Sequence, residues 1–419
     1  MALIKKPVTG MKDILPAEME IRDYVLGIIR ETYRSYGYAT IETPGVEHIE
    51  NLTSKQGGDN EKLIFKILKR GDRLNLAEAK SDTDIVDSGL RYDLTLPLCR
   101  YYANNAANLP MPFKALQVGN VWRADRPQKG RFRQFVQCDI DVLGDPTNQV
   151  EIESVLAITK TLHRILPDRH MTVHINDRAI LKGMADYCGF PEEDIAEIFV
   201  ILDKMDKIGE SGVREELLGR GLRQESVDRY LGLLDNVTAD ADGVRRLGEK
   251  ISSAMDPAKA ENLAQIMETV RAVSHLDFDL IFDPTMVRGQ GYYTGTIFEV
   301  SMDGFGGAVA GGGRYDHLVG KFTGQDVPAC GISIGFERII TILLEAGFKV
   351  PESAGKKAFL YEKGLSPEQF SKVLSAAEAE REKGTKVALA LMAKNKKFQK
   401  EKFAEDGYTE FEEFYRRNL

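Results

Sequence analysis

The segment 118–141, VGNVWRADRPQKGRFRQFVQCDID, decides the fold of this chain. Apolar residues alternate on both sides of a Pro-Gln-Lys-Gly turn, at Leu116 and Val118 before it and at Ile140 and Val142 after it. The hairpin is strongly basic, and its cationic residues are Lys114, Arg123, Arg126, Lys129, Arg131 and Arg133. The pattern predicts one strand, a long basic loop and an antiparallel return strand.

Arginines that project from a rigid sheet suit a polyphosphate ligand, because each guanidinium presents a planar fork of hydrogen-bond donors. A solvated basic hairpin is the simpler interpretation of the same composition. The return strand favours a binding site, since Gln137, Asp139 and Asp141 alternate along it and should face one side of the sheet. Cationic groups for phosphate and acceptors for a second ligand are thus predicted on one surface.

The hairpin resembles motif 2 of the class II aminoacyl-tRNA synthetases, in the histidyl-tRNA synthetase form R-x-x-R-P-Q-x-G-R-[FY]-R-[EQ]-F. The resemblance implies an α+β fold: a class II antiparallel sheet flanked by helices, with a helical insertion and a small α/β C-terminal domain. It also implies that Gln137 and Asp141 contact bound histidine. A site built around a polar group of its substrate can reject analogues that lack the group by about 10⁴-fold.

A helix is predicted over residues 17–37, where Ile21, Val25 and Ile28 lie on one apolar stripe and a glycine ends the run. The next residues, YATIETP, are predicted as a strand. A helix followed by a strand that ends in Thr-Pro resembles class II motif 1, and the resemblance implies a homodimer. The preceding GMKDILP resembles the N-terminal signature of the family.

The segment GLRYDLT, residues 89–95, resembles the family motif L-R-x-[DE]-x-T. Asp93 and Thr95 lie two apart on a predicted strand, so their side chains should point the same way. A carboxylate and a hydroxyl on one face can hold an ammonium group through charge-assisted hydrogen bonds. The resemblance implies that they bind the α-amino group of histidine, although an isolated D-x-T is usually a turn or a cap.

The segment RGQGYYTGTIFE, residues 288–299, resembles the histidine-specific motif R-G-L-D-Y-Y-T-G, with Gln290-Gly291 in place of Leu-Asp. On a predicted strand, the rings of Tyr292 and Tyr293 should point to opposite faces, and such a pair usually packs in a core. The resemblance implies that Arg288 meets the α-phosphate of ATP and that both tyrosines border the histidine side chain.

Two glycine-rich stretches, GGAVAGGGRYDHLV at 306–319 and GISIGFERI at 331–339, resemble class II motif 3. The first is predicted as a loop, whose glycines allow the backbone to approach adenine or another substrate closely. Arg338 is predicted to open a helix after a strand, and the resemblance implies that it meets the γ-phosphate. No Walker or dinucleotide-binding pattern is present.

The resemblance thus implies four sets of site residues. The catalytic residues are Arg123, Arg288 and Arg338. Histidine is bound by Asp93, Thr95, Arg123, Gln137, Asp141, Arg288, Tyr292 and Tyr293. ATP, accompanied by Mg²⁺ but by no metal on dedicated protein ligands, is bound by Arg123, Arg131 and Arg338. The loop that meets the tRNA acceptor end carries Arg126, Gln128, Lys129 and Arg133.

Four segments are predicted along the chain. Residues 1–170 hold the first part of the catalytic core and 276–350 the second, with strands expected at KLIFKILKR, RLNLAE and 279–300. Residues 171–275 are predicted as a helical insertion that resembles that of the family and acts as a scaffold or a tRNA clamp. Residues 355–419 show a short βαβα pattern and resemble a reduced anticodon-binding domain.

Composition limits the possible classes of protein. A chain of 419 residues can form several domains, and its net charge of −8 argues against a general nucleic-acid binder. The residues from 355 onward are more basic than acidic, so binding of one particular RNA stays open. Four cysteines without paired spacing, no apolar leader and no long apolar run predict a cytoplasmic protein without a membrane span.

The resemblance implies ATP-dependent ligation of L-histidine to tRNA(His) through a histidyl-adenylate. The alternative is a paralogue that senses histidine as the regulatory subunit of ATP phosphoribosyltransferase, which the shortened C-terminus and Gln290-Gly291 favour. The complete loop R-A-D-R-P-Q-K-G-R-F-R argues against that alternative. An RNA-binding or structural protein on the same fold would be expected to lose Arg338, which this chain keeps.

Overall fold

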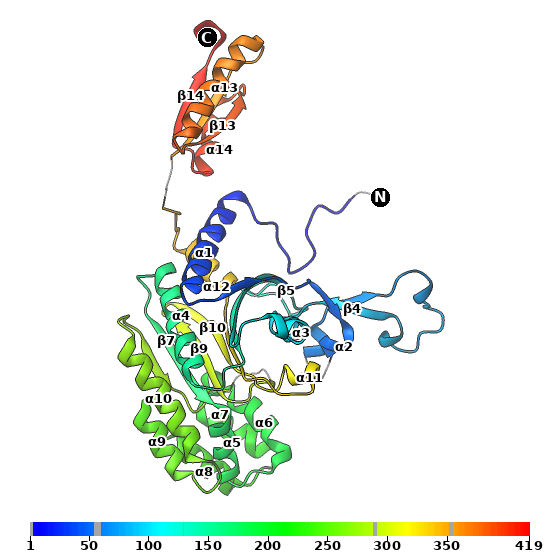
Figure 1. The fold of residues 1–419 in the computed structure, drawn as a ribbon, viewed down its shortest axis with the longest axis vertical. Coiled ribbons are helices and arrows are strands. Elements are labelled where there is room, and N and C mark those ends of the chain that lie inside the picture. Colours follow the sequence, from blue (N-terminus) through cyan, green and yellow to red (C-terminus); the bar gives the residue numbers. More distant parts are fainter. Residues whose placement is uncertain (1–2, 54–59, 129, 236, 288–290, 352–354) are drawn as a thin grey trace. The chain divides into compact units, whose positions relative to one another are not determined.

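The computed structural model describes residues 3–53, 60–128, 130–235, 237–287, 291–351 and 355–419 (Figure 1). Lys129, Arg288 and Gln290, all named above, lie outside the described residues. The chain forms two compact units. The first unit comprises Met1–Met11 and Gly27–Ile342, and the second comprises Lys12–Leu26 and Leu343–Leu419.

An eight-stranded sheet is the centre of the first unit. In spatial order its strands are β1 (Ala39–Ile41), β5 (Phe113–Trp122), β6 (Gln134–Leu143), β11 (Ala329–Ile334), β10 (Phe305–Arg314), β9 (Thr296–Met302), β7 (Met171–Asp177) and β8 (Asp279–Phe282). All neighbours are antiparallel except the pairs β1–β5 and β7–β8. The predicted antiparallel sheet is confirmed. Its strand β11, the last in sequence, lies between β6 and β10.

The basic hairpin is the pair β5–β6, with the strand, loop and return strand that the alternation predicts. Its register places Gly119 opposite Gln137, and Gln117 opposite Asp139. The glycine-rich stretch predicted as a loop is instead strand β10. Glycine is needed there for close strand contact, since a Cβ at Gly312 would overlap the carbonyl oxygen of Gly331 on β11.

Helices cover the sheet (Figure 1). Apart from the helices between residues 178 and 273, those of this unit are α1 (Pro16–Ser35), α2 (Ile49–Thr53), α3 (Thr95–Asn105), α4 (Gln149–Ile165), α11 (Gly320–Thr323) and α12 (Phe336–Glu345). Helices α1 and α12 also contribute residues to the second unit. The prediction of α1 is confirmed, and Gly37 follows it with a left-handed φ of 84°. Helix α4 contacts β10 and β11. None of the described helices combines the length and apolar character needed to cross a membrane.

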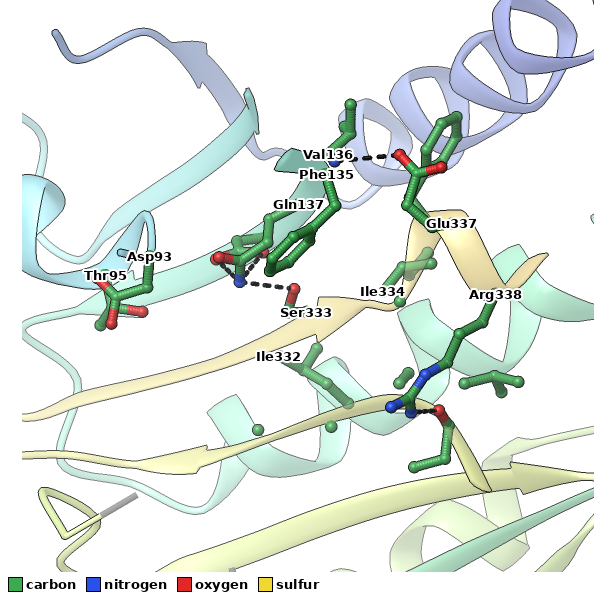
Figure 2. A pocket seen from close by; sticks show the side chains of 18 of the residues that line it. Asp93, Thr95, Phe135, Val136, Gln137, Ile332, Ser333, Ile334, Glu337 and Arg338 are labelled. Carbon is green, nitrogen blue, oxygen red and sulfur yellow. Dashed lines mark hydrogen bonds between the residues drawn. The ribbon is translucent and has the colours of Figure 1, made fainter. Parts of the chain in front are cut away.

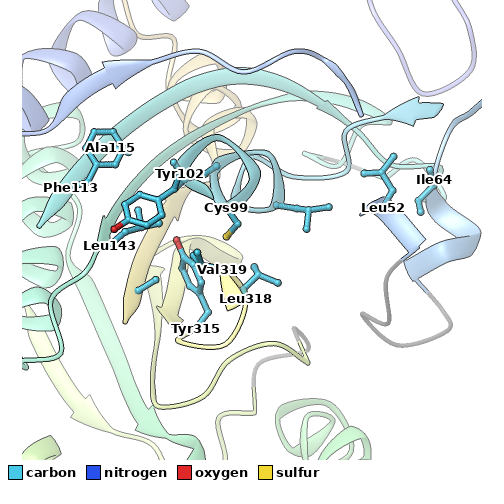
Figure 3. Packing of buried hydrophobic residues seen from close by; sticks show 13 residues of the cluster. Leu52, Ile64, Cys99, Tyr102, Phe113, Ala115, Leu143, Tyr315, Leu318 and Val319 are labelled. Atoms are coloured by element: carbon cyan, nitrogen blue, oxygen red, sulfur yellow. The ribbon is translucent and has the colours of Figure 1, made fainter. Parts of the chain in front are cut away.

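An apolar cluster joins α3 to the sheet (Figure 3). Cys99 and Tyr102 of α3 are buried there together with Phe113 of β5, whose ring centroid lies 6.5 Å from that of Tyr102. Tyr315, which follows β10, belongs to the same cluster. The cluster therefore fixes α3 and the end of β10 next to each other, and both carry residues of the site described below.

The helical segment consists of α5 (Arg178–Tyr187), α6 (Ile195–Leu202), α7 (Met205–Gly219), α8 (Gln224–Leu234), α9 (Ala241–Lys250) and α10 (Pro257–Val273). In Figure 1 these helices gather at one end of the sheet. They begin at Arg178 and not at residue 171, because residues 171–177 form β7 and pair with β9. Three of them start at aspartate caps, where Asp177, Asp240 and Asp256 accept backbone N–H groups.

A small antiparallel sheet contains β2 (Val46–His48), β4 (Val86–Leu90) and β3 (Lys66–Leu68), in that order. The strand predicted within KLIFKILKR is therefore β3. The strand predicted at RLNLAE is wrong, since Arg73 ends a 3-10 helix, residues 76–78 form a turn and Leu76 is exposed. Short 3-10 helices occupy this region, one of them stabilised by reciprocal capping between Ser81 and Asp84.

The second unit contains a three-stranded parallel sheet in the order β13 (Lys386–Leu391), β12 (Lys356–Tyr361) and β14 (Glu410–Phe414). Helices α13 (Pro367–Glu382) and α14 (Lys396–Glu405) connect the strands. The βαβα prediction is confirmed, and β14 adds a strand that was not predicted. Phe359 of β12 packs against Val373 and Ala377 of α13.

Candidate active site

An open cavity lies on the face of the large sheet toward which Gln137, Asp139 and Asp141 point (Figure 2). All three line the cavity, as their alternation on β6 predicts. The sheet extends this face, because Asp139 is opposite Ser333 of β11 and Ser333 is opposite Gly311 of β10. Further lining residues are Asp93, Thr95, Arg123, Arg131, Tyr292, Tyr293 and Arg338.

Arg123 follows β5 directly, lines the cavity and lies close to two aromatic rings. Its guanidinium carbon lies 4.2 Å from the ring centroid of Tyr92 and 5.2 Å from that of Phe135. Its Nε donates a hydrogen bond to the carbonyl oxygen of Tyr92 at 3.1 Å. No hydrogen bond joins its two terminal nitrogens to any of the described residues, so they are available to an anion.

Asp93 and Thr95 line the cavity, but they do so from a helix start and not from a strand. Strand β4 ends at Leu90, and Thr95 is the first residue of α3. Asp93 caps this helix, since its Oδ1 accepts the N–H of Leu96 at 3.2 Å. The predicted common strand is therefore wrong, whereas the predicted proximity of a carboxylate and a hydroxyl is correct.

Three buried carboxyl groups, those of Asp93, Asp139 and Asp141, share the cavity. Burial raises the pKa of Asp141 to about 7. Burial, and then the neighbouring Asp141, raise the pKa of Asp139. Burial also raises the pKa of Asp93, which the guanidinium of Arg123 opposes. A ligand that brings cationic or proton-donating groups would relieve this repulsion.

Tyr315 holds the carboxyl group of Asp141 in place. Its hydroxyl donates to Asp141 Oδ1 at 2.6 Å, while Oδ2 is buried without a hydrogen-bond partner. Gly331 lies opposite Asp141 in the sheet, and a Cβ there would overlap Oδ1. The Oε1 atom of Gln137 is likewise buried without a partner. Two acceptors are therefore left to a ligand.

Tyr292 and Tyr293 both line the cavity. They lie in the turn before β9 and not on a strand, since the strands of the segment 279–300 are β8 and β9. Their ring centroids are 4.8 Å apart, and the ring of Tyr292 meets that of Tyr315 edge-on at 6.0 Å. The two rings therefore form one apolar wall, which the prediction of opposite faces did not anticipate.

Arg131 and Arg338 mark the other end of the cavity. Arg131 Nε lies 3.4 Å from Asp125 Oδ2, and Arg338 donates to the carbonyl oxygen of Ala308. Next to Arg338, Glu337 Oε1 accepts the N–H of Val136 at 3.3 Å and so connects α12 to β6. Figure 2 shows Arg338 and the pair Asp93–Thr95 on opposite sides of the view. The cavity thus carries Arg131 and Arg338 at one end, accompanied by the carboxyl groups of Asp125 and Glu337, and the carboxyl group of Asp93 at the other.

The remaining loop residues lie apart from the cavity lining. Gln128 and Arg131 exchange backbone hydrogen bonds and close the turn of the hairpin loop. Arg133 is occupied by the protein itself, since its Nε donates to the carbonyl oxygen of Asp125 at 3.0 Å and its Nη1 to that of Thr9 at 3.4 Å. Besides Arg123, Arg131 and Arg133, the structure describes one more positively charged residue of this loop, Arg126.

Three residues of the site, Tyr92, Tyr315 and Ser333, were not identified from the sequence as site residues. All three stand inside segments that the motifs singled out. Tyr315 contacts Asp141 across 174 positions of sequence, a pairing that no local pattern can reveal. Ser333 alternates with Gly331 on β11, and this period of two is the signal that could have placed it on the cavity face.

An antiparallel sheet flanked by helices, with arginines at one end of its exposed face, defines the class II aminoacyl-tRNA synthetases. A family model described as histidyl-tRNA synthetase matches residues 10–339. A relative from Leifsonia xyli subsp. xyli (strain CTCB07), described as histidine–tRNA ligase, is 40% identical over 416 residues, which are 97% of this chain and 94% of the relative. The chain belongs to the histidyl-tRNA synthetase family.

Other comparisons agree with this membership. A histidine–tRNA ligase from Porphyromonas gingivalis (strain ATCC BAA-308 / W83) is 35% identical over 91% of this chain and 85% of its own length. A crystal structure of histidyl-tRNA synthetase from Nostoc sp. PCC 7120 has a TM-score of 0.78 at 27% identity, covering 97% of this chain and 90% of that one.

A solved structure described as an ATP phosphoribosyltransferase regulatory subunit/histidyl-tRNA synthetase, from Bacillus halodurans C, has a TM-score of 0.75. It covers 99% of both chains but is only 20% identical to this one, so it shows the fold alone.

Proposed function

We propose that this protein ligates L-histidine to tRNA(His), with ATP as co-substrate and a histidyl-adenylate as intermediate. One observation carries the proposal: a single cavity presents unpartnered acceptors on Gln137 and Asp141 near one end and guanidinium groups at the other. An amino acid with a proton-donating side chain suits the first end, and a polyphosphate suits the second.

In the proposed complex, Asp93, Thr95 and the free Oε1 of Gln137 receive the α-ammonium group of histidine. The free Oδ2 of Asp141 accepts an imidazole N–H, and the wall of Tyr292 and Tyr293 covers the ring. An apolar wall with one fixed acceptor distinguishes imidazole from an aliphatic or phenyl side chain.

ATP is proposed to lie with its phosphates toward Arg123, Arg131 and Arg338, and Arg288 is proposed for the α-phosphate. Mg²⁺ would arrive as the complex with ATP. The carboxyl groups of Asp125 and Glu337 line the same end and offer the oxygen ligands that Mg²⁺ prefers.

The reaction follows from these positions. A carboxylate oxygen of histidine attacks the α-phosphorus of ATP, the new C–O–P linkage forms, and the bond to the leaving pyrophosphate breaks. A terminal ribose hydroxyl of the tRNA then attacks the acyl carbon, and AMP leaves. Alignment of the reactants and neutralisation of the phosphate charge supply the catalysis, and no covalent nucleophile is required.

The partners of the proposed ligase follow from the family. We propose a homodimer through the motif 1 region, and acceptor-end contacts by Arg126, Gln128, Lys129 and Arg133. Of these, Arg133 is already engaged by backbone carbonyls, so Arg126 is the stronger candidate. We also propose that the helices α5 to α10, which begin at Arg178, are the insertion, that residues 355–419 are a reduced anticodon-binding domain, and that the protein acts in the cytoplasm. Four buried free thiols support that compartment.

Histidine-dependent exchange of labelled pyrophosphate into ATP, followed by charging of tRNA(His), tests the proposal. Exchange together with charging is the expected result. Exchange without charging would restrict the function to amino-acid activation. Histidine binding without exchange would instead support the regulatory paralogue, which the names of the relatives do not favour.

The Asp141→Asn variant should lose histidine affinity and gain stability. The amide oxygen can still accept from Tyr315, but the charged acceptor for imidazole is gone, so we expect the KM for histidine to rise about 10- to 100-fold at pH 8. The KM for ATP should change less than about threefold. Equal increases for both substrates would contradict the assignment.

The stability gain of this variant should depend on pH. Because burial raises the pKa of Asp141 to about 7, the wild-type carboxyl favours the folded state below about pH 4 and loses that contribution as the pH rises through 7. The free Asp141→Asn protein should therefore melt at a higher temperature than wild type at pH 8, with the difference shrinking below pH 7 and vanishing near pH 4. A difference in melting temperature that does not change with pH would contradict the explanation by the raised pKa of Asp141.

A further inference from the structure

Tyr92 makes two contacts with Arg123, and none of the roles implied for the site residues accounts for them. Tyr92 lies in the short segment between β4 and α3, one residue before Asp93. It contacts Arg123 twice, through its ring face at 4.2 Å from the guanidinium carbon and through its carbonyl oxygen at 3.1 Å from Nε. Both contacts come from one residue, so they fix the direction of the guanidinium as well as its position.

The two contacts leave the reactive edge of the guanidinium exposed to the cavity. A cation above a ring is attracted to the negative face of that ring, and the attraction strengthens where water is excluded. With the ring of Tyr92 next to the guanidinium carbon and Nε on a carbonyl oxygen, both terminal nitrogens remain without a hydrogen bond to any of the described residues. The edge that carries them is the part that can bind two phosphate or carboxylate oxygens at once.

We propose that Tyr92 is a positioning residue for the adenylation step, which holds the fork of Arg123 toward the reacting carboxylate and α-phosphate. The inference rests on the proposed function. Tyr92 acts only through Arg123, and the aromatic ring is the group that matters.

The position of Tyr92 in the chain adds a second consequence. Its neighbour Asp93 lines the acidic end of the cavity, where the ammonium group of histidine is proposed to bind. One peptide bond therefore links the carbonyl that orients Arg123 to the carboxylate that orients histidine. Such a link fixes the position of histidine relative to the α-phosphate of ATP. A misplacement of about 1 Å can cost roughly 100-fold in rate.

Phe135 does not replace this contact. Its ring centroid lies 5.2 Å from the guanidinium carbon, 1.0 Å farther than that of Tyr92, and no hydrogen bond to Arg123 accompanies it. The hydroxyl of Tyr92 also has no part in either contact with Arg123, since one uses the ring face and the other the backbone. Phenylalanine at position 92 should therefore preserve the arrangement, and leucine should not.

The test compares Tyr92→Leu with Tyr92→Phe in the full-length protein. The readouts are the rate of pyrophosphate exchange per active site, counted by adenylate formation in a single turnover, and the dissociation constant for histidine. Tyr92→Leu should lower kcat about 10- to 100-fold while histidine affinity changes less than about threefold. Tyr92→Phe should stay within about threefold of wild type in both.

A rate counted per active site separates positioning from folding, because a purely structural loss would reduce the number of sites and not their turnover. If Tyr92→Leu fails to fold, Tyr92→Met provides the same loss of the ring with a flexible apolar side chain. Unchanged kcat in the folded leucine or methionine variant would overturn the inference, as would an equal loss in Tyr92→Phe.

A double-mutant cycle with Arg123→Ala tests whether Tyr92 acts through Arg123. In that background, Tyr92→Leu should cost less than about threefold, because the group it positions is already absent. Losses that multiply fully would overturn the inference. Absence of exchange in the wild-type protein would instead contradict the proposed function, so the two failures are distinguishable.

Discussion

Replacement of Arg123 by lysine should reduce histidine-dependent pyrophosphate exchange by about 10³-fold, although the charge is kept. The flat guanidinium lies close to the rings of Tyr92 and Phe135, and Arg123 lines the cavity. Lysine has neither the planar group that stacks on an aromatic ring nor the fork that binds two oxygens at once. The loss should therefore appear in kcat, where interactions made only in the transition state are found.

The measurement is steady-state exchange at saturating histidine and ATP. The control is Arg214→Lys on α7, where an exposed arginine pairs with Glu210 and Asp228 at the surface. Exposed pairs contribute little, so the control should behave as wild type. If Arg123→Lys retained more than about a tenth of the wild-type rate, charge alone would suffice, and the importance given to the fork would be wrong.

The Gly331→Ala variant should lose at least about 100-fold in histidine affinity. The added methyl group would overlap Asp141 Oδ1 and would come within 2.9 Å of the carbonyl oxygen of Ile140. Asp141 is buried and tied to Tyr315, so its carboxyl group cannot move aside without breaking that hydrogen bond. One methyl group outside the reacting atoms would thus remove the imidazole acceptor.

Calorimetric titration with histidine measures this effect, and binding of an ATP analogue reports on the rest of the cavity. Gly306→Ala is the matched control, because Gly306 belongs to β10 of the same sheet and a Cβ there meets nothing within 4 Å. Adding Asp141→Ala to Gly331→Ala removes the nearest overlap and should restore melting temperature without restoring histidine affinity. Recovery of both would show that Asp141 does not bind the ligand.

The hairpin shows how much of this site the sequence could predict. The alternation of Gln137, Asp139 and Asp141 requires only that β6 be extended, and an extended strand has a side-chain period of two. The cationic loop could likewise be predicted, because the number and spacing of its arginines are local features of the chain. Predictions of this kind succeed wherever one regular element carries the whole pattern.

Other parts of the site could not be predicted from the periodicity of the sequence. Asp93 and Thr95 were placed on a strand, but Asp93 caps α3, and a D-x-T sequence suits both roles. Tyr292 and Tyr293 share the cavity because a turn, and not a strand, carries them. The bond from Tyr315 to Asp141 and the close packing of Gly331 depend on neighbours distant in sequence, which only the assembled sheet specifies.

The order of strands also determines when the cavity can exist during synthesis. Strand β11 is the last of the eight to leave the ribosome, yet it joins β6 on one side to β10 on the other. A nascent chain that ends before Ala329 therefore holds two separate ladders, each with an unpaired edge where β11 will later insert. Such edges readily pair with other chains. The emerging polypeptide thus stays open to misassembly until β11 has been synthesised, and histidine cannot assist its folding before then.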